Sequence, residues 1–197
     1  MDAPPIGRSE DLAVERDLVE AARRGDREAY VDLIRPRFAR LFAIAHRILR
    51  DVDRAEDALQ DTLVIAWRDL RSLRDPDRFD GWLSRVLVNE CTNQASRERR
   101  RVAKLLVLPV DGPATSDADL LTVVNRDLLE RGFRRLTPDQ RAILVLRHYA
   151  GYSMSEIAET LGIPPGTVRS RLHHAHRAMR AAVEADDRSQ VLGGRLA

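Results

Sequence analysis

Residues 137–183 carry the start and stop signals of three consecutive helices, and this pattern constrains the fold more than any other part of the chain. Thr137-Pro138-Asp139-Gln140 combines a threonine cap, a proline in the first helical position and a glutamine three residues after the cap. Ser153-Met154-Ser155-Glu156 is a second capping box. Gly162-Ile163-Pro164 then makes a turn before a longer helix that starts at Pro165. The spacing predicts a helix-turn-helix.

The last of these helices has an apolar side and a basic side. The apolar stripe consists of Val168, Leu172, Ala175, Met179 and Ala182. The opposite face carries Arg169, Ser170, Arg171, His173, His174 and Arg177. A narrow buried stripe and a basic, hydrogen-bonding outer face suit a helix that lies in the major groove of DNA. An arginine-rich solvated helix in an ordinary bundle is the alternative, and the two capping boxes and the turn argue against it.

The composition limits the remaining possibilities. The chain has 197 residues, 44% of them hydrophobic and 32% charged, which is enough for one large or two small domains. The formal net charge is only +2, so any affinity for nucleic acid must come from where the charges lie. No signal peptide is evident, and no stretch approaches the roughly 20 apolar residues of a membrane span. We therefore expect a cytoplasmic chain without membrane insertion.

Helical periodicity dominates the chain, and the alternation typical of strands is absent. The pattern predicts a helix from about residue 12 to 24 that ends at Gly25, and a second that begins after Asp26 and is interrupted at Pro36. A third helix follows the cap at Asp51, a fourth runs from about 79 to 101, and another from about 120 to 135.

The predicted fold is all-α, with two small helical domains joined by a flexible linker and a helix-turn-helix in the C-terminal one. Residues 9–104 form the first domain and residues 120–184 the second. Residues 105–119 are the linker, since proline, glycine and aspartate gather there. Residues 185–197 are expected to be a disordered tail.

Two helix faces are candidates for binding. Asp57, Gln60, Asp61 and Val64 fall on adjoining turns of the third helix, opposite its apolar stripe. A solvated helix face is the simpler interpretation of these residues, and a docking surface for a basic partner is the alternative. Along the fourth helix a stripe recurs every three or four residues: Arg78, Trp82, Arg85, Asn89, Asn93 and Arg97.

This second stripe has the chemistry of a nucleic-acid surface. Arginine pairs with phosphate, asparagine matches the hydrogen-bonding edge of adenine, and an aromatic ring stacks on an unpaired base. The alternative for Trp82 is that most of its ring lies in the core. Burial of Asn89 and Asn93 would be costly, so we expect both side chains to be exposed.

No catalytic residue, cofactor or metal site is predicted, and we do not expect an enzyme. The single cysteine, Cys91, excludes an intramolecular disulfide and has apolar neighbours typical of a core position. His173, His174 and His176 suggest metal ligation, but adjacent histidines point in different directions on a helix, and no nearby carboxylate is paired with them.

Together these residues resemble bacterial RNA polymerase sigma factors of the extracytoplasmic-function type, in the sigma-70 family. Ala55-Glu56-Asp57-Ala58-Leu59-Gln60-Asp61-Thr62 with Ala66-Trp67 is similar to the family's helix that binds core polymerase. Phe79-Asp80-Gly81-Trp82-Leu83, continuing through Asn89 and Asn93 to the arginine run, is similar to its minus-ten promoter helix. Residues 162–172 are similar to its minus-thirty-five recognition motif. The resemblance spans roughly residues 14–183.

The resemblance implies an alternative sigma factor whose partners are core RNA polymerase, promoter DNA and an anti-sigma factor. The implied polymerase-binding residues are Asp57, Gln60, Asp61 and Val64. The residues implied to hold the opened minus-ten element are Arg78, Arg85, Asn89, Asn93 and Arg97. The residues implied to bind the minus-thirty-five duplex are Thr167, Arg169, Ser170, Arg171, His173 and His174. Two other functions stay open: a helix-turn-helix regulator that is not a sigma factor, and a thiol hydrolase using Cys91.

Overall fold

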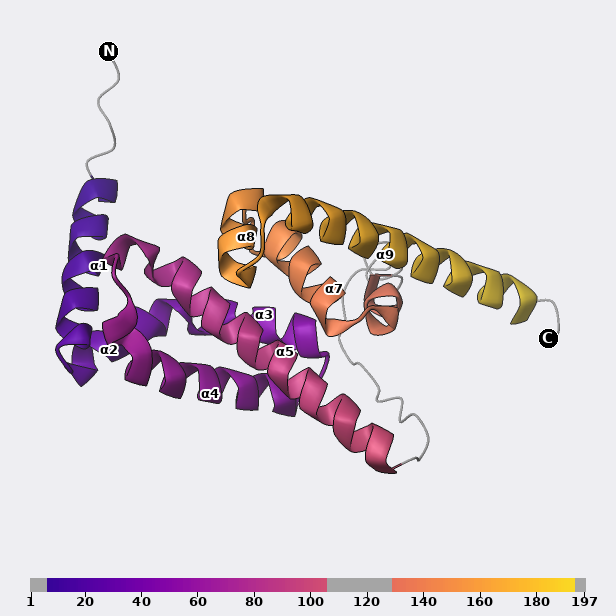
Figure 1. Cartoon of the computed structure of the whole chain (residues 1–197), viewed down its shortest axis with the longest axis horizontal. Coiled ribbons are helices and arrows are strands. Elements are labelled where there is room, and N and C mark those ends of the chain that lie inside the picture. The colour runs from indigo at the N-terminus through magenta and orange to yellow at the C-terminus, as the bar shows by residue number, and fades with distance from the viewer. Residues whose placement is uncertain (1–6, 106–128, 194–197) are drawn as a thin grey trace, which may run out of the picture. The chain divides into compact units, whose positions relative to one another are not determined.

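A computed structural model describes residues 7–105 and 129–193, and every regular element in these ranges is a helix (Figure 1). This confirms the predicted all-α class. The chain divides into two compact units at Cys91–Thr92, within α5, with residues 159–162 grouped with the first unit. The proposed domain limits of 9–104 and 120–184 stay a prediction. Apart from Leu105, the predicted linker lies outside the described residues, as does much of the predicted helix 120–135.

The helices up to residue 105 are α1 (Gly7–Arg23), α2 (Arg27–Ile34), η1 (Arg35–Arg37), α3 (Phe38–Leu49), α4 (Val52–Asp69), η2 (Leu70–Ser72), η3 (Pro76–Arg78) and α5 (Phe79–Leu105). From residue 129 onwards, residues 129–135 are helical and are followed by α7 (Pro138–Leu144), the π-helical turn η4 (Val145–Tyr149), α8 (Met154–Leu161) and α9 (Pro165–Gly193).

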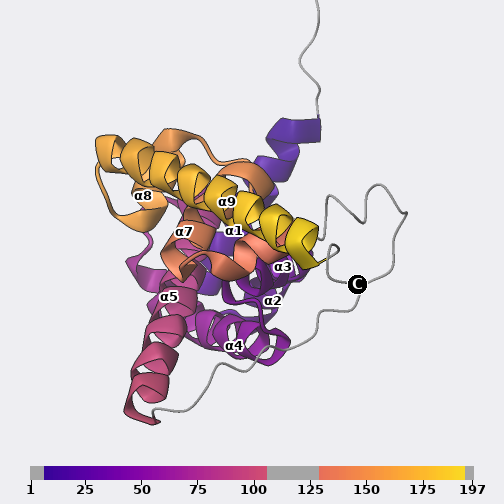
Figure 2. The same ribbon diagram turned by 90° about the vertical axis from the view of Figure 1, so that its right-hand side faces the viewer.

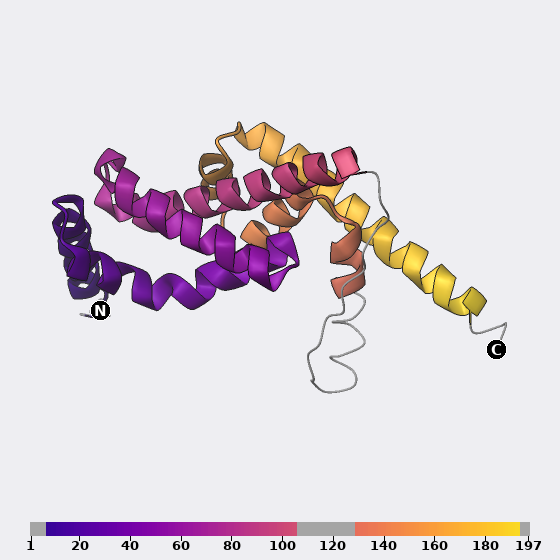
Figure 3. The same cartoon turned by 90° about the horizontal axis from the view of Figure 1, so that it is seen from below.

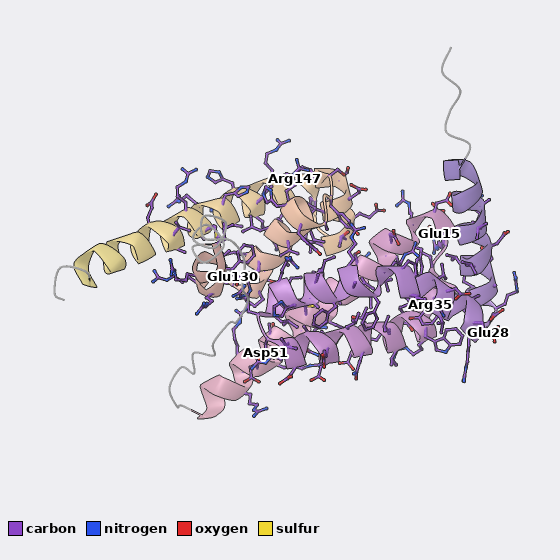
Figure 4. All side chains as sticks on the ribbon, turned by 180° about the vertical axis from the view of Figure 1, so that it is seen from behind. Glu15, Glu28, Arg35, Asp51, Glu130 and Arg147 are labelled. Atoms are coloured by element: carbon purple, nitrogen blue, oxygen red, sulfur yellow. The ribbon has the colours of Figure 1, made fainter. Side chains whose placement is uncertain are left out.

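Local signals explain most of the early helix boundaries. The Asp26 carboxylate accepts hydrogen bonds from the backbone N–H groups of Glu28 and Ala29, at 2.9 and 3.1 Å. The Asp51 carboxylate, at the start of α4 in Figure 4, accepts one from the Arg54 N–H at 3.0 Å. Each satisfies N–H groups that a helix start leaves without an intrahelical partner. Both caps confirm the sequence prediction, as does the 3₁₀ turn at Pro36.

The apolar stripes of these helices meet in one core. α1 packs against α2, and α3 packs against α4, which returns alongside it in the opposite direction (Figure 3). The largest side chains that are fully buried there are Leu33, Ile44, Ile48, Leu59, Leu70, Phe79, Leu83 and Leu87. This burial of one side of α4 and one side of α5 leaves the opposite sides of both helices facing solvent.

A half-buried arginine joins three of the early segments. The Arg37 guanidinium forms ion pairs with Glu15 of α1 and Asp80 of α5. It also donates a hydrogen bond to the Leu33 carbonyl oxygen at 2.8 Å and lies over the Phe79 ring, 5.2 Å from its centre. Because arginine presents several donors in a planar fork, one side chain satisfies all of these partners and stabilises the start of α5 against α1 and η1.

The later helices form a core of their own, in which α7 packs against α9 (Figure 2). Both predicted capping boxes are present. The Gln140 and Glu156 backbone N–H groups donate to the Thr137 and Ser153 hydroxyls at 3.3 and 3.2 Å. The reciprocal bonds from the cap N–H groups to the Gln140 and Glu156 side chains are 2.9 and 2.7 Å. Residues 142–146 are all buried, so this helix lies at the centre of the core.

Three helix ends and one turn differ from the prediction. α1 begins at Gly7 and α5 continues to Leu105, so both helices extend beyond their apolar stripes. α7 continues directly into the π-helical turn η4, which the sequence pattern did not indicate. α9 runs to Gly193, so residues 185–193 are helical where a disordered tail was expected. This stretch contains no proline, and its first glycine is Gly193, so no residue stops the helix before that point.

Candidate nucleic-acid interface

The turn between α8 and α9 sets the direction in which α9 leaves the helix-turn-helix. Gly162 has a φ of 64°, a left-handed conformation that favours glycine. The Ile163 N–H donates to the Ala158 carbonyl oxygen at 3.0 Å, closing the end of α8. The Pro164 carbonyl oxygen then accepts from the N–H groups of Thr167 and Val168 at 2.9 and 3.1 Å, which starts α9.

The predicted DNA-facing residues of α9 lie on its solvent side. Val168 and Ala175 are fully buried and orient the helix. The exposed residues are Arg169, Ser170, Arg171, His173 and His174, whereas Thr167 is half-buried. The Ser170 hydroxyl donates to the Thr167 carbonyl oxygen at 3.0 Å, so it already has a partner on its own helix.

The formally charged side chains in the first part of α9, residues 165–183, are all positive. Between Pro165 and Val183 the sequence contains four arginines and no aspartate or glutamate. The N-terminus of the helix adds the partial positive charge of its macrodipole next to Arg169. A polyanion is therefore attracted to the first turns of α9.

A second polar stripe runs along α5. Arg85, Asn89, Asn93 and Arg97 are all exposed and are spaced four residues apart, so they line one side of the helix. Leu83, Leu87 and Cys91 are buried on the other side. Exposure of the two asparagines confirms the expectation from the sequence.

The start of this stripe divides between solvent and core. Arg78, the last residue of η3, is exposed. Trp82 is half-buried, and its ring lies 6.1 Å from that of Phe79, which is fully buried. The tryptophan therefore has one part in the core, as the alternative interpretation expected, and one part at the surface.

The outward face of α4 is acidic and partly apolar. Asp57, Gln60 and Asp61 are exposed, and Val64 is 66% exposed. Ala58, Leu59, Thr62 and Ala66 are buried on the opposite side. The helix contains five acidic residues and two arginines, which gives it a formal charge of −3. An exposed valine within an acidic surface is a combination suited to binding a protein with basic side chains.

Trp67 turns away from this face and has a structural role. Its ring lies 5.1 Å from that of Tyr30 in an edge-to-face contact. The Tyr30 hydroxyl donates to the Leu63 carbonyl oxygen at 2.7 Å, and burial raises the pKa of Tyr30 to about 12. This pair links α2 to α4, so Trp67 holds the helix that presents the acidic face.

Neither a nucleophilic cysteine nor a membrane-spanning helix is supported by the described residues. Cys91 is fully buried, and its pKa is raised to about 12, first by burial and then by the nearby Glu90 charge. A nucleophilic cysteine requires a lowered pKa and access to solvent, so this thiol does not fit a hydrolase. Among residues 7–105 and 129–193, no helix is long and apolar enough to cross a membrane.

Comparison with known proteins gives matches at both ends of the chain. Residues 33–101 match the family model described as sigma-70 region 2, and residues 126–179 match the one described as sigma-70, region 4. The ECF RNA polymerase sigma factor SigM of Mycobacterium tuberculosis is 34% identical over 161 residues, which is 81% of this chain and 79% of SigM. The RNA polymerase sigma-H factor of Pseudomonas aeruginosa is 28% identical over 181 residues, covering 86% of this chain and 94% of that protein.

Two solved structures are also similar. The sigma factor RpoE in complex with the anti-sigma factor NepR from Bartonella quintana matches with a TM-score of 0.65 and 26% identity, covering 79% of this chain and 99% of that one. CnrH in complex with the cytosolic domain of CnrY matches with a TM-score of 0.60 and 26% identity, covering 88% of this chain and 99% of that one.

Proposed function

The chain belongs to the extracytoplasmic-function (ECF) sigma factors of the sigma-70 family, and on that premise we propose how its exposed faces divide the work of promoter recognition. It is an alternative sigma factor that directs transcription initiation. The observation that carries the proposal is the presence, in family order, of an acidic face on α4, an Arg/Asn stripe on α5 and a basic face on α9. A helix-turn-helix regulator of another class is not favoured, because the region 2 match covers residues 33–101.

We assign binding of core RNA polymerase to the α4 face formed by Asp57, Gln60, Asp61 and Val64. The carboxylates would pair with basic side chains, and burial of Val64 would add apolar contact at the centre of the interface. All four side chains face solvent, so docking there requires no rearrangement of the core beneath α4.

We assign the opened minus-ten element to the α5 stripe, which consists of Arg78, Arg85, Asn89, Asn93 and Arg97. Arginines spaced along the stripe match the repeated negative charge of a DNA strand, and the asparagine amides match the hydrogen-bonding edges of unpaired bases. The surface part of Trp82 provides an apolar face beside them. The stripe would hold a single strand and so favour melting.

We assign the minus-thirty-five duplex to the first turns of α9. Arg169 and Arg171 are exposed next to the positive end of the helix, together with Ser170, His173 and His174, and Thr167 lies half-buried beside them. Arginine reads guanine through two parallel hydrogen bonds in the major groove, which would supply base specificity, while the other side chains would contact phosphate.

The partners follow from the same premise. We propose that an anti-sigma protein binds this chain, since one similar solved structure contains a sigma factor in complex with the anti-sigma factor NepR. The other contains CnrH in complex with the cytosolic domain of CnrY. We also propose that the chain acts in the cytoplasm, with the polymerase. Sigma factors are not enzymes, and we assign the chemistry of transcription to the core polymerase alone.

Run-off transcription tests the proposed function. A cognate promoter is first identified by mapping the transcript starts that appear when the chain is overexpressed. On a fragment carrying that promoter, purified core polymerase and this chain, with no other sigma factor, should initiate transcription at a defined start. A scrambled minus-ten or minus-thirty-five element should abolish the product. Initiation that still requires a second sigma factor would exclude this function.

The substitution Asn89→Ala is expected to slow promoter opening about 5- to 150-fold, the equivalent of the 1–3 kcal/mol that a bidentate base contact contributes. Permanganate footprinting of the unpaired thymines measures the opening. Asn89 is exposed, so the variant should fold normally and keep its affinity for core polymerase. A parallel loss of polymerase affinity would show that Asn89 acts in docking and would contradict the assignment.

A further inference from the structure

Two histidines that are far apart in the sequence meet on the surface of the helix-turn-helix unit. His148 lies in η4 and His176 lies in α9, and both are exposed. Their Nε2 atoms are 2.8 Å apart, and their rings meet at 60° with centroids 5.1 Å apart. The promoter contacts proposed above do not use either residue. At this distance one Nε2–H donates to the lone pair of the other, so the contact requires at least one neutral ring.

The π-helical turn is what presents His148. The Ala150 N–H donates to the Val145 carbonyl oxygen at 2.9 Å, which gives the turn one residue more than an α-helix. Val145 and Leu146 stay buried within this turn, while His148 reaches the surface next to α9. Single π-helical turns are rare and occur frequently at functional sites.

The separation of the two nitrogens matches a known coordination geometry. Two nitrogens that each lie about 2.0–2.1 Å from one ion, at a right angle, are about 2.9 Å apart, whereas tetrahedral ligands are about 3.3–3.4 Å apart. The observed 2.8 Å is the length of an ordinary hydrogen bond between the two rings, and it also brings both nitrogens within reach of one ion. Imidazole binds Ni²⁺, Cu²⁺ and Zn²⁺, and the square or tetragonal arrangement that Ni²⁺ and Cu²⁺ adopt accepts nitrogens this close together.

We propose that His148 and His176 form a two-histidine site for a divalent transition-metal ion of the Ni²⁺ and Cu²⁺ type. Both Nε2 atoms would turn their lone pairs to the ion, with each proton on Nδ1. In residues 7–105 and 129–193 no group of three or more His, Cys, Asp or Glu is placed to hold a metal. Water molecules would therefore fill the other coordination positions.

The surroundings of His148 favour the unprotonated ring that a metal requires. Its pKa is lowered, first by burial and then by the charges of His176 and Arg147. Arg147 also opposes a cation, although its guanidinium donates to the Tyr152 carbonyl oxygen at 2.9 Å; Figure 4 labels this residue. With two protein ligands and a nearby arginine, the site would bind the metal ion with moderate affinity, and binding would be reversible.

The bound ion would cross-link η4 to α9. An ion that binds only the folded unit stabilises it in proportion to the logarithm of the free metal concentration above the dissociation constant. This link would then restrain α9 in its packed position against α7. Metal binding by this pair does not depend on the promoter contacts assigned above.

Calorimetric titration of the untagged full chain with NiCl₂ tests the site, with thermal unfolding measured at each metal concentration. We expect one ion per chain at saturation and a Tm that rises with Ni²⁺. His148→Ala and His176→Ala should each weaken binding at least about 10-fold and should remove the rise in Tm. Loss of a residue that only hydrogen-bonds to a metal ligand already costs about 10- to 100-fold.

His173→Ala and His174→Ala are the matched controls, because both change exposed histidines of α9 outside the pair. They should keep the affinity and the Tm shift of the unmodified chain. Unchanged Ni²⁺ affinity in His148→Ala would overturn the proposal, because the ion would then be held by histidines of α9 alone. Absence of saturable binding in the unmodified chain would overturn it as well.

Discussion

Reversing two charges on α4, in Asp57→Lys/Asp61→Lys, is expected to weaken the complex with core RNA polymerase about 100-fold, and with it all promoter-specific transcription. Both carboxylates are exposed, and they lie one turn apart on the face that also carries Val64. If basic side chains of the polymerase meet this face, each substitution replaces an attraction by a repulsion between like charges. Both carboxylates are exposed, so water and salt screen these repulsions, and a combined cost of about 2.7 kcal/mol corresponds to the expected factor of about 100.

Glu28→Lys/Asp32→Lys is the matched control for this variant. The two residues are exposed on α2 with the same four-residue spacing, and the change in net charge is the same. This control should bind polymerase with nearly normal affinity, because its charges lie on another helix. Fluorescence anisotropy of a labelled chain titrated with core polymerase measures both variants. Equal losses in the two would show that overall charge, and not the α4 face, governs the affinity.

The substitution Arg169→Ala is expected to reduce discrimination between the minus-thirty-five element and a scrambled sequence by about 1–3 kcal/mol, or about 5- to 150-fold. Arg169 is exposed in the second turn of α9, near the positive end of the helix. A bidentate contact to a guanine would be lost entirely, whereas affinity for non-specific DNA would fall only by one charge contact. Specificity should therefore fall more than affinity.

Arg180→Ala provides the comparison. Arg180 is also exposed and lies on the same side of α9, eleven residues further along, which is about 16 Å at the rise of an α-helix. It should lie beyond the base-reading turns, so its loss should leave the specificity ratio unchanged. Filter binding of holoenzyme to cognate and scrambled fragments at two salt concentrations separates the two effects. An equal fall in specificity for both variants would contradict the assignment of base reading to Arg169.

Helix boundaries and exposed faces were predictable because their causes are local. The caps at Asp26, Asp51, Thr137 and Ser153 act on N–H groups no more than three residues away. The side of a helix that is buried follows from periodicity, so the outward positions of Asp57 and Asn89 were also predictable. The ends of α1, α5 and α9 were less predictable, because a helix continues beyond its apolar stripe when no residue stops it.

Contacts between distant segments had no such local signal. Arg37 bonds to Glu15 and Asp80, 22 and 43 residues away, and these pairs exist only once α1, η1 and α5 have packed. No local sequence pattern therefore distinguished Arg37 from the other arginines. The orientation of Trp67 towards Tyr30, away from the acidic face, likewise depends on how α2 lies against α4.

Hydrogen bonding and periodicity act within a few residues. They are therefore enough to specify the helical class, the caps and turns of the helix-turn-helix, and which faces of α4, α5 and α9 meet solvent. The pairing of His148 with His176, which are 28 residues apart, arises only when the helices pack together. The sequence grouped His176 with its neighbours on α9, whereas its contact lies on another element. That contact depends on the angle at which α7 and the π-helical turn pack against α9, and packing angles arise from the whole core.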